Sequence, residues 1–159
     1  MPQISILFAC LGNICRSPLA EGILRHLAAA AGRADEFLID SAGTGAWHVG
    51  DPPDSRAIAV AAEHGIDIST LRARRVEAAD FDRFDLILAL DRKNLQSLRE
   101  SAPAGASARI ALFAEHAFAT ADDVPDPYFG GRAEFEDVYR MLYRGCASMA
   151  GSPKDEPPS

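Results

Sequence analysis

The stretch Ile4–Pro18, ISILFACLGNICRSP, decides the fold of this chain. Its largely apolar first part, Ile4–Ala9, is typical of a strand buried on both faces of a parallel sheet. A short turn begins at Cys10, and the Ser-Pro pair that closes the stretch predicts the first turn of a helix. A strand, a tight turn and a helix in this order gather the backbone N–H groups of the turn around one point, as in other anion sites.

Cys10 and Arg16 are separated by five residues, so a curled loop brings the thiol and the guanidinium to opposite sides of one anion. A helix N-terminus and a nearby cation both stabilise a thiolate. The planar fork of an arginine holds two phosphoryl oxygens at once. Ser17 is placed to donate a hydrogen bond to the sulfur, while Gly12 and Asn13 tolerate left-handed backbone. The pattern predicts attack of a thiolate on a bound phosphate, and it lacks the Gly-Lys-Ser/Thr ending of a nucleotide-binding Walker loop.

Short apolar runs alternate with helical patterns along the rest of the chain. The runs predict strands at Ile4–Ala9, Phe37–Ser41, Phe84–Leu90 and Arg109–Phe113. The helical patterns span Pro18–Ala31, Asp54–His64, Asp91–Glu100 and Arg132–Ala150. This alternation predicts a single α/β domain, a four-stranded parallel sheet with helices on both faces and the phosphate-binding loop after strand 1. We expect the domain to span residues 1–150, and residues 151–159, rich in Pro and charge, to form a disordered tail.

Composition fits a small intracellular protein. A chain of 159 residues suits one domain, and its net charge of −7 disfavours nucleic acid and anionic membranes as partners. Three cysteines, no leader peptide and no run of transmembrane length indicate a cytoplasmic protein. The four histidines lack ligand spacing, so no metal site is expected. A basic cluster at Arg72, Arg74 and Arg75 is interpreted as a solvated face, or as a contact for acidic substrate segments.

The segment Cys10–Pro18, CLGNICRSP, resembles the signature loop of the low molecular weight protein tyrosine phosphatases. The resemblance continues through Asp40–Thr44 to Asp126–Tyr128 and the final helix, and covers all but about the last ten residues. It implies hydrolysis of phosphotyrosine monoesters through a phosphocysteine intermediate, with no cofactor. The expected partners are phosphotyrosine proteins or small aryl phosphates, with inorganic phosphate as an inhibiting product.

Asp126 heads an Asp-Pro-Tyr sequence. An aspartate on a loop above the phosphate site can protonate the tyrosyl oxygen as its bond to phosphorus breaks. The resemblance implies that Asp126 is this general acid, and that Cys10 and Arg16 are the other catalytic residues. Asp122 and Asp123 lie nearby but lack the matching context.

The resemblance also outlines the pocket. It places Trp47 and Tyr128 at the mouth, while Phe129 stands where many relatives carry a second tyrosine, and Ile14 can pack against a planar ring. Arginine phosphatases of the same superfamily tend to have threonine at the position of Ile14, which disfavours phosphoarginine as substrate. The residues expected to bind phosphate are Leu11, Gly12, Asn13, Ile14, Cys15, Arg16 and Ser17.

Three residues, Asn13, Ser17 and Ser41, are expected to hold the shape of the loop through hydrogen bonds, as in the family. Ser41 has the alternative interpretation of a simple turn residue. Cys15 is predicted to trap a sulfenic acid on Cys10 as a disulfide. The alternative is that Cys15 only packs behind the loop.

Other functions of the same fold stay open at this point. An arginine phosphatase is one. An arsenate reductase needs further cysteines as a relay, and the region after Asp80 offers none before Cys146. A non-catalytic phosphate-binding regulatory module is expected to lack Cys10, Arg16 or Asp126, and all three are present.

Overall fold

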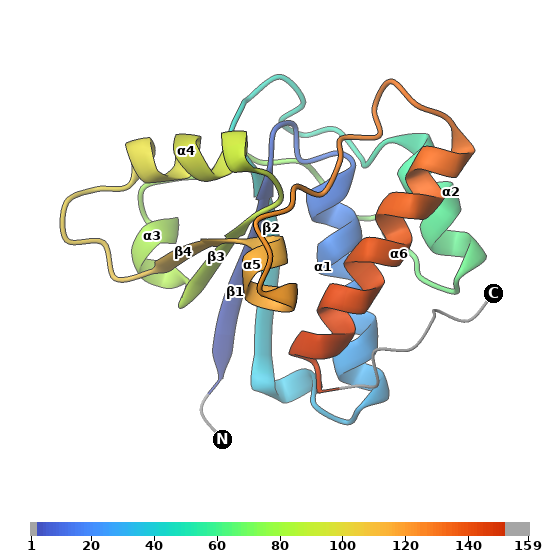
Figure 1. Ribbon diagram of the computed structural model, residues 1–159, viewed down its shortest axis with the longest axis horizontal. Helices are drawn as coiled ribbons and strands as arrows, with labels where there is room; N and C mark the ends of the chain where they lie inside the picture. Colours follow the sequence, from blue (N-terminus) through green and yellow to red (C-terminus); the bar gives the residue numbers. More distant parts are fainter. Residues whose placement is uncertain (1–2, 152–159) are drawn as a thin grey trace.

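Four parallel strands form the centre of the fold, in the order β2-β1-β3-β4 (Figure 1). The computed structural model describes residues 3–151. The strands are β1 (Ile4–Cys10), β2 (Phe37–Gly43), β3 (Leu86–Ala89) and β4 (Arg109–Leu112). The helices are α1 (Arg16–Ala30), α2 (Ser55–Glu63), α3 (Asp80–Arg83), α4 (Arg92–Ser101), α5 (Phe113–Phe118) and α6 (Arg132–Met149), with a 3-10 turn at Ala34–Glu36.

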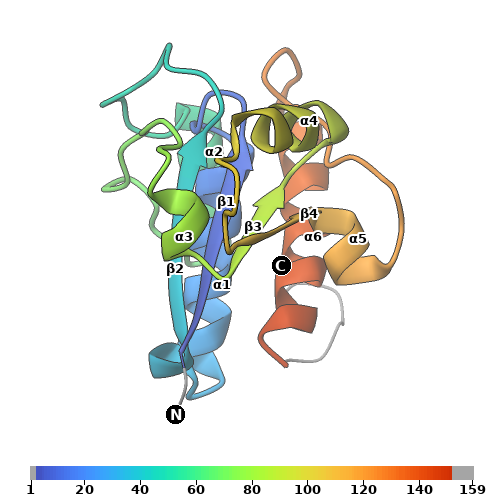
Figure 2. The ribbon, with the colours of Figure 1, turned by 90° about the vertical axis from the view of Figure 1, so that its left-hand side faces the viewer.

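Helices cover both faces of the sheet, as the sequence predicts. Figures 1 and 2 show α1, α2, α5 and α6 on one face and α3 with α4 on the other. Each face has its own apolar core. The larger core joins Phe8 of β1 to Leu19 of α1 and Phe135 of α6, and the smaller joins Leu7 to Phe81.

Strand β1 is central in the sheet and pairs with both β2 and β3. Side chains alternate between the two faces of a strand, so Cys10 lies on the face of Ile6 and Phe8. These three residues belong to the core that includes α1, which follows the strand directly. The nucleophile predicted from the sequence therefore lies at the carboxyl end of a central strand, on the side of the sheet that α1 covers.

The predicted elements are all present, and their ends differ from the predicted ones by at most two residues. Helix α1 begins at Arg16, two residues before the predicted start, so Arg16 lies in its first turn. Gly32 and Gly65, just beyond the ends of α1 and α2, have φ angles of +71° and +78°, which suit glycine. Phe113 was expected to end a strand but begins α5.

Helices α3 and α5 have no counterpart among the predicted elements. They have four and six residues, too short for an amphipathic period to stand out. The predicted tail at 151–159 lies outside the described residues, apart from Gly151. Within residues 3–151, no helix has the length and apolar character needed to cross a bilayer.

Candidate active site

The loop between β1 and α1 curls around a pocket of about 240 Å³. Its carbonyl groups are anchored from outside: those of Cys10, Leu11 and Ile14 accept hydrogen bonds from the backbone of Thr44, Gly45 and Asp54. In contrast, the backbone N–H groups of residues 11–15 have no acceptor anywhere in residues 3–151. Unpaired backbone donors close to a helix N-terminus are the main requirement for binding an anion.

Cys10 lies at the base of this pocket and is almost fully buried. Its Sγ atom is 2.9 Å from the Ser17 Oγ atom, in the first turn of α1. Ser17 also accepts a hydrogen bond from the Asn13 Nδ2 atom at 2.7 Å. With that acceptor position filled, the Ser17 hydroxyl is free to donate its proton to the sulfur.

Asn13 adopts left-handed backbone, with φ of +57°, and its side chain explains why this conformation is held. Besides Ser17, its Nδ2 atom donates to Ser41 Oγ at 3.0 Å, and its Oδ1 atom accepts from the Arg74 N–H at 3.0 Å. The three residues predicted to shape the loop are thus connected to one another and to Cys10.

Arg16 is only 3% exposed and is held from two sides. Its Nη1 atom donates to Asp91 Oδ2 at 2.7 Å and to the Val124 carbonyl at 2.9 Å. Burial by itself lowers the pKa of this guanidinium, but Cys10 and Asp91 outweigh burial, so the pKa is raised. Arg16 therefore stays charged inside the fold. Asp91 was not predicted from the sequence; its one signal is its place as the N-cap of α4, two residues after the end of β3.

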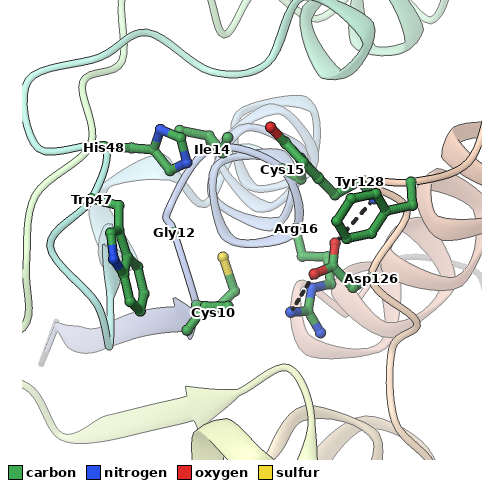
Figure 3. Close-up of a pocket in the computed structure, with 11 residues that line it drawn as sticks. Cys10, Gly12, Ile14, Cys15, Arg16, Trp47, His48, Asp126 and Tyr128 are labelled. Carbon is green, nitrogen blue, oxygen red and sulfur yellow. Dashed lines mark hydrogen bonds and ion pairs between the residues drawn. The ribbon is translucent and has the colours of Figure 1, made fainter.

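Asp126 lies across the pocket from the loop, with its carboxylate 3.7 Å from the Arg16 Nη2 atom (Figure 3). The carboxylate is 45% exposed. Its Oδ1 atom accepts a hydrogen bond from the Tyr128 N–H at 3.1 Å, which fixes the turn through Pro127. Cys10, Arg16 and Asp126, far apart in the sequence, thus line one pocket.

Aromatic side chains form the walls of the pocket. Trp47 and Tyr128 stand on opposite sides of Cys10, with Ile14 at the back (Figure 3). The Trp47 indole packs on Gly45, where a Cβ atom would lie only 2.0 Å from the ring. The Trp47 side chain is nevertheless 74% exposed, so it is not a buried anchor of its loop. Phe129 also lines the pocket, as expected.

His48 was given no role from the sequence, yet it lines the pocket beside Trp47. Its ring packs against the loop at Gly12, where an added Cβ atom would lie 3.0 Å from the His48 Cδ2 atom. The Nδ1 atom is 3.3 Å from the Asp51 carboxylate. Glycine at position 12 therefore leaves room for this imidazole as well as for an anion.

Cys15 lies on the pocket lining with its side chain buried. Burial, and then the negative charges of Asp54 and Cys10, raise the pKa of its thiol far above the usual range. Cys15 is therefore a protonated thiol. Cys10 and Cys15 line the same pocket, and both are free cysteines.

Glu21 supports the loop from inside α1 and was also missed from the sequence. It is 2% exposed and accepts a hydrogen bond from Ser41 Oγ at 2.6 Å. Arg25 pairs with its other oxygen at 2.7 Å. Burial raises the pKa of Glu21, and the bonds from Ser41 and Arg25 offset only part of that rise. Glu21 extends the chain of contacts that begins at Cys10 and passes through Ser17, Asn13 and Ser41.

We expect Glu21→Gln to remove a pH dependence of stability. Because the pKa of Glu21 is raised by folding, the folded chain binds this proton more tightly than the unfolded chain. The free energy of unfolding of the native protein therefore falls as pH rises from the ordinary carboxyl pKa to the raised one. Glutamine still accepts from Ser41 but does not titrate, so the variant gains stability relative to the native protein as pH rises.

Urea unfolding of both proteins at pH 4 and pH 8 measures this effect. Glu100→Gln, which changes an exposed carboxyl on α4, is the matched control and should show no such change. The interpretation would be contradicted if Glu21→Gln and the native protein differed in free energy of unfolding by the same amount at both pH values.

The basic cluster predicted at 72–75 is divided in the structure. Arg72 and Arg75 are exposed, as a solvated face requires. Arg74 instead pairs with Asp40 at 3.1 Å and with the fully buried Asp80 at 2.9 Å. Since the backbone N–H of Arg74 also holds Asn13, this ion pair positions the loop, and Arg74 is a structural residue.

Comparison with known proteins agrees with this geometry. The family model described as low molecular weight phosphotyrosine protein phosphatase matches residues 5–156. The chain is 45% identical to the low molecular weight phosphotyrosine protein phosphatase of Schizosaccharomyces pombe, over 88% of this chain and 90% of that protein.

Two solved structures superpose closely on the chain. YfkJ from Bacillus subtilis has a TM-score of 0.86 and 39% identity, covering 95% of this chain and 94% of that one. The Drosophila arginine phosphatase DARP has a TM-score of 0.84 and 32% identity, covering 92% and 95%. With a family model matched over nearly its whole length, this chain is a hydrolase that belongs to the low molecular weight phosphotyrosine protein phosphatase family.

Proposed function

We propose that this protein hydrolyses phosphotyrosine monoesters in two steps, through a phosphocysteine intermediate on Cys10. The observation that carries the proposal is the gathering of Cys10, Arg16 and Asp126 around one pocket whose loop N–H groups have no acceptor within residues 3–151. The phosphoryl oxygens bind these N–H groups and the Arg16 guanidinium, which remains charged because of Asp91 and Cys10.

In the first step, the Cys10 sulfur attacks phosphorus and the bond from phosphorus to the tyrosyl oxygen breaks. Asp126, above the loop, gives its proton to that oxygen as it leaves. In the second step, water attacks the phosphocysteine while the Asp126 carboxylate accepts a proton from it. The sulfur leaves with a hydrogen bond from Ser17, whose Oγ atom is 2.9 Å away.

The walls of the pocket favour an aryl phosphate. A flat ring fits between Trp47 and Tyr128, and its ester oxygen then points toward the loop at the base. Phosphotyrosine proteins and small aryl phosphates are therefore the proposed substrates. Inorganic phosphate, the product, occupies the same loop and inhibits.

Particular residues argue against the alternative functions of arginine phosphatase, arsenate reductase and non-catalytic module. Ile14 supplies an apolar surface to the pocket, which favours an aromatic ring over a guanidinium. Cys146 is fully buried on α6 and contacts the Ala20 carbonyl, so it does not suit the thiol relay of an arsenate reductase. A non-catalytic module would not need Arg16 and Asp126 on the same pocket as a reactive thiol.

A substrate panel tests the function. Phosphotyrosine, phosphoserine and phosphoarginine peptides of one sequence are compared by kcat/KM, and arsenate reduction is measured with a thiol reductant. We expect phosphotyrosine to be hydrolysed fastest and arsenate reduction to be negligible. A higher kcat/KM for phosphoarginine would overturn the proposal. Ile14→Thr opens the pocket beside the loop. In this variant the ratio of kcat/KM for the phosphotyrosine peptide to that for the phosphoarginine peptide should be smaller than in the native protein.

The cell compartment and the partners follow from charge and cysteine chemistry. The three cysteines are free thiols, which persist in a reducing compartment, so we place the protein in the cytoplasm. The net charge of −7 disfavours binding to nucleic acid or to an anionic membrane.

Cys15 is proposed to protect Cys10 from irreversible oxidation. Peroxide converts the Cys10 thiolate into a sulfenic acid and releases hydroxide. The Cys15 thiol then attacks that sulfur, so that a disulfide forms and water leaves. Cys15 lines the same pocket as Cys10. Because the raised pKa of Cys15 leaves little of its thiolate, we expect trapping to be slow and high peroxide doses to defeat it.

We expect peroxide to inactivate both the native protein and Cys15→Ser. Dithiothreitol should then restore at least about fivefold more activity to the native protein than to Cys15→Ser. Phosphate should slow inactivation of both by occupying the loop. The measurement is activity after a low peroxide dose and reduction, with mass spectrometry of the Cys10 peptide. Cys146→Ser, remote from the pocket, is the control and should recover like the native protein. Equal recovery of Cys15→Ser and the native protein would rule out protection.

A further inference from the structure

Exposed apolar side chains are concentrated at the mouth of the pocket. Of the seven large apolar side chains exposed within residues 3–151, four line this one pocket. We call these four the apolar rim: Leu11, Trp47, Tyr128 and Phe129. Scattered exposed apolar residues are ordinary on protein surfaces, but a cluster around a binding site indicates a contact surface.

Phe129 is the extreme member of the rim, because its side chain is 97% exposed. The turn that carries it is well braced. The Gly130 N–H donates to the Pro127 carbonyl at 2.8 Å, and Arg56 donates to the Gly130 carbonyl at 2.9 Å. The Phe129 and Tyr128 rings pack edge to face, with their centroids 5.0 Å apart. A braced turn thus presents a phenyl ring that gains almost no burial from folding.

The charges at the mouth oppose acidic ligands. Asp51, which contacts His48 on the pocket lining, is more than half exposed there. The two arginines beside the pocket already have carboxylate partners: Arg16 pairs with Asp91, and Arg56 pairs with Asp54 at 2.9 Å. An acidic residue next to the phosphotyrosine would therefore meet the Asp51 carboxylate and find both of these arginines already paired.

We propose that the apolar rim binds large apolar residues next to the phosphotyrosine, so that the enzyme selects sites with apolar neighbours over sites with acidic ones. This inference rests on the proposed phosphatase function. In an extended peptide, neighbouring residues lie roughly 3.3 Å apart along the chain. When the phosphotyrosine ring enters between Trp47 and Tyr128, its neighbours therefore remain at the mouth, within reach of Leu11 and Phe129.

The test uses four phosphotyrosine peptides that differ only in the two residues beside the phosphotyrosine, which are leucine, alanine, lysine or aspartate. We expect kcat/KM to be about tenfold higher with leucine than with alanine, and lower with aspartate than with alanine. In Phe129→Ala, the ratio of kcat/KM for leucine to that for alanine should fall several-fold. Leu38→Ala, which removes an equally apolar exposed side chain on β2, should leave the ratio as in the native protein.

The outcomes separate this inference from the proposed function. Equal kcat/KM for the leucine and alanine peptides, or a preference for aspartate, would overturn the apolar-neighbour inference while phosphotyrosine hydrolysis stands. Failure to hydrolyse any of the four peptides would overturn the function itself. Sedimentation of the native protein and of Phe129→Ala tests whether the apolar rim instead binds a second copy of the chain. A native dimer that is lost in Phe129→Ala would assign the rim to that contact and overturn the inference.

Discussion

Replacing Cys10 with serine is expected to lower kcat by at least about 10⁴-fold while phosphate still binds. A serine hydroxyl is a far weaker nucleophile than a thiolate, and the side chain in contact with the Cys10 Sγ atom is the Ser17 hydroxyl, which does not act as a base. Phosphate binding depends instead on the loop N–H groups and on Arg16, which the substitution leaves in place. The measurements are kcat with an aryl phosphate and the Kd of phosphate by calorimetry.

Two controls make the Cys10 result interpretable. Cys146→Ser changes a fully buried thiol on α6 and should keep kcat near that of the native protein. Arg16→Ala should lose phosphate binding as well as rate, because it removes the cation that Asp91 orients. Rapid acid quenching of the native enzyme should trap phosphate on Cys10 within the first turnover. Hydrolysis by Cys10→Ser at more than about a hundredth of the native rate would show that another group attacks phosphorus.

The loop could be predicted from the sequence because its chemistry is local. Cys10 and Arg16 lie within one short segment, and strand, turn and helix follow from the apolar run and the Ser-Pro pair. The backbone conformation of Asn13 could also be predicted, because asparagine tolerates left-handed backbone. Its observed φ is +57°. The role predicted for Asp126 rests on the family resemblance, because Asp-Pro pairs by themselves usually mark turns.

The groups that hold the loop could not be predicted, because they come from distant parts of the chain. Asp91, 75 residues beyond Arg16, orients the guanidinium. The pair of Arg74 with Asp80 fixes the backbone that holds Asn13, yet from the sequence Arg74 was one of three surface arginines. Glu21 stands in an ordinary helical pattern, and only the packing of α1 against β2 shows that its carboxyl is buried. Long-range contacts of this kind leave no local signal in a single sequence.

Asp126→Asn is expected to lower kcat by about 10²–10⁴-fold for phosphotyrosine, the usual cost of losing a general acid. The substitution is conservative for the fold. An asparagine Oδ1 atom still accepts the hydrogen bond from the Tyr128 N–H, so the turn that carries the side chain should keep its shape. What the variant loses is the proton for the departing tyrosyl oxygen.

The dependence on the leaving group distinguishes this role from a structural one. A nitrophenolate leaves without needing a proton, so Asp126→Asn should lose much less rate with a dinitrophenyl phosphate than with phosphotyrosine or phenyl phosphate. A plot of log kcat/KM against leaving-group pKa should therefore be steeper for the variant than for the native enzyme. Asp122→Asn, at an exposed carboxyl on the same segment, should reproduce the native slope. Equal losses across all leaving groups would instead assign Asp126 to positioning Arg16, whose Nη2 atom lies 3.7 Å from its carboxylate.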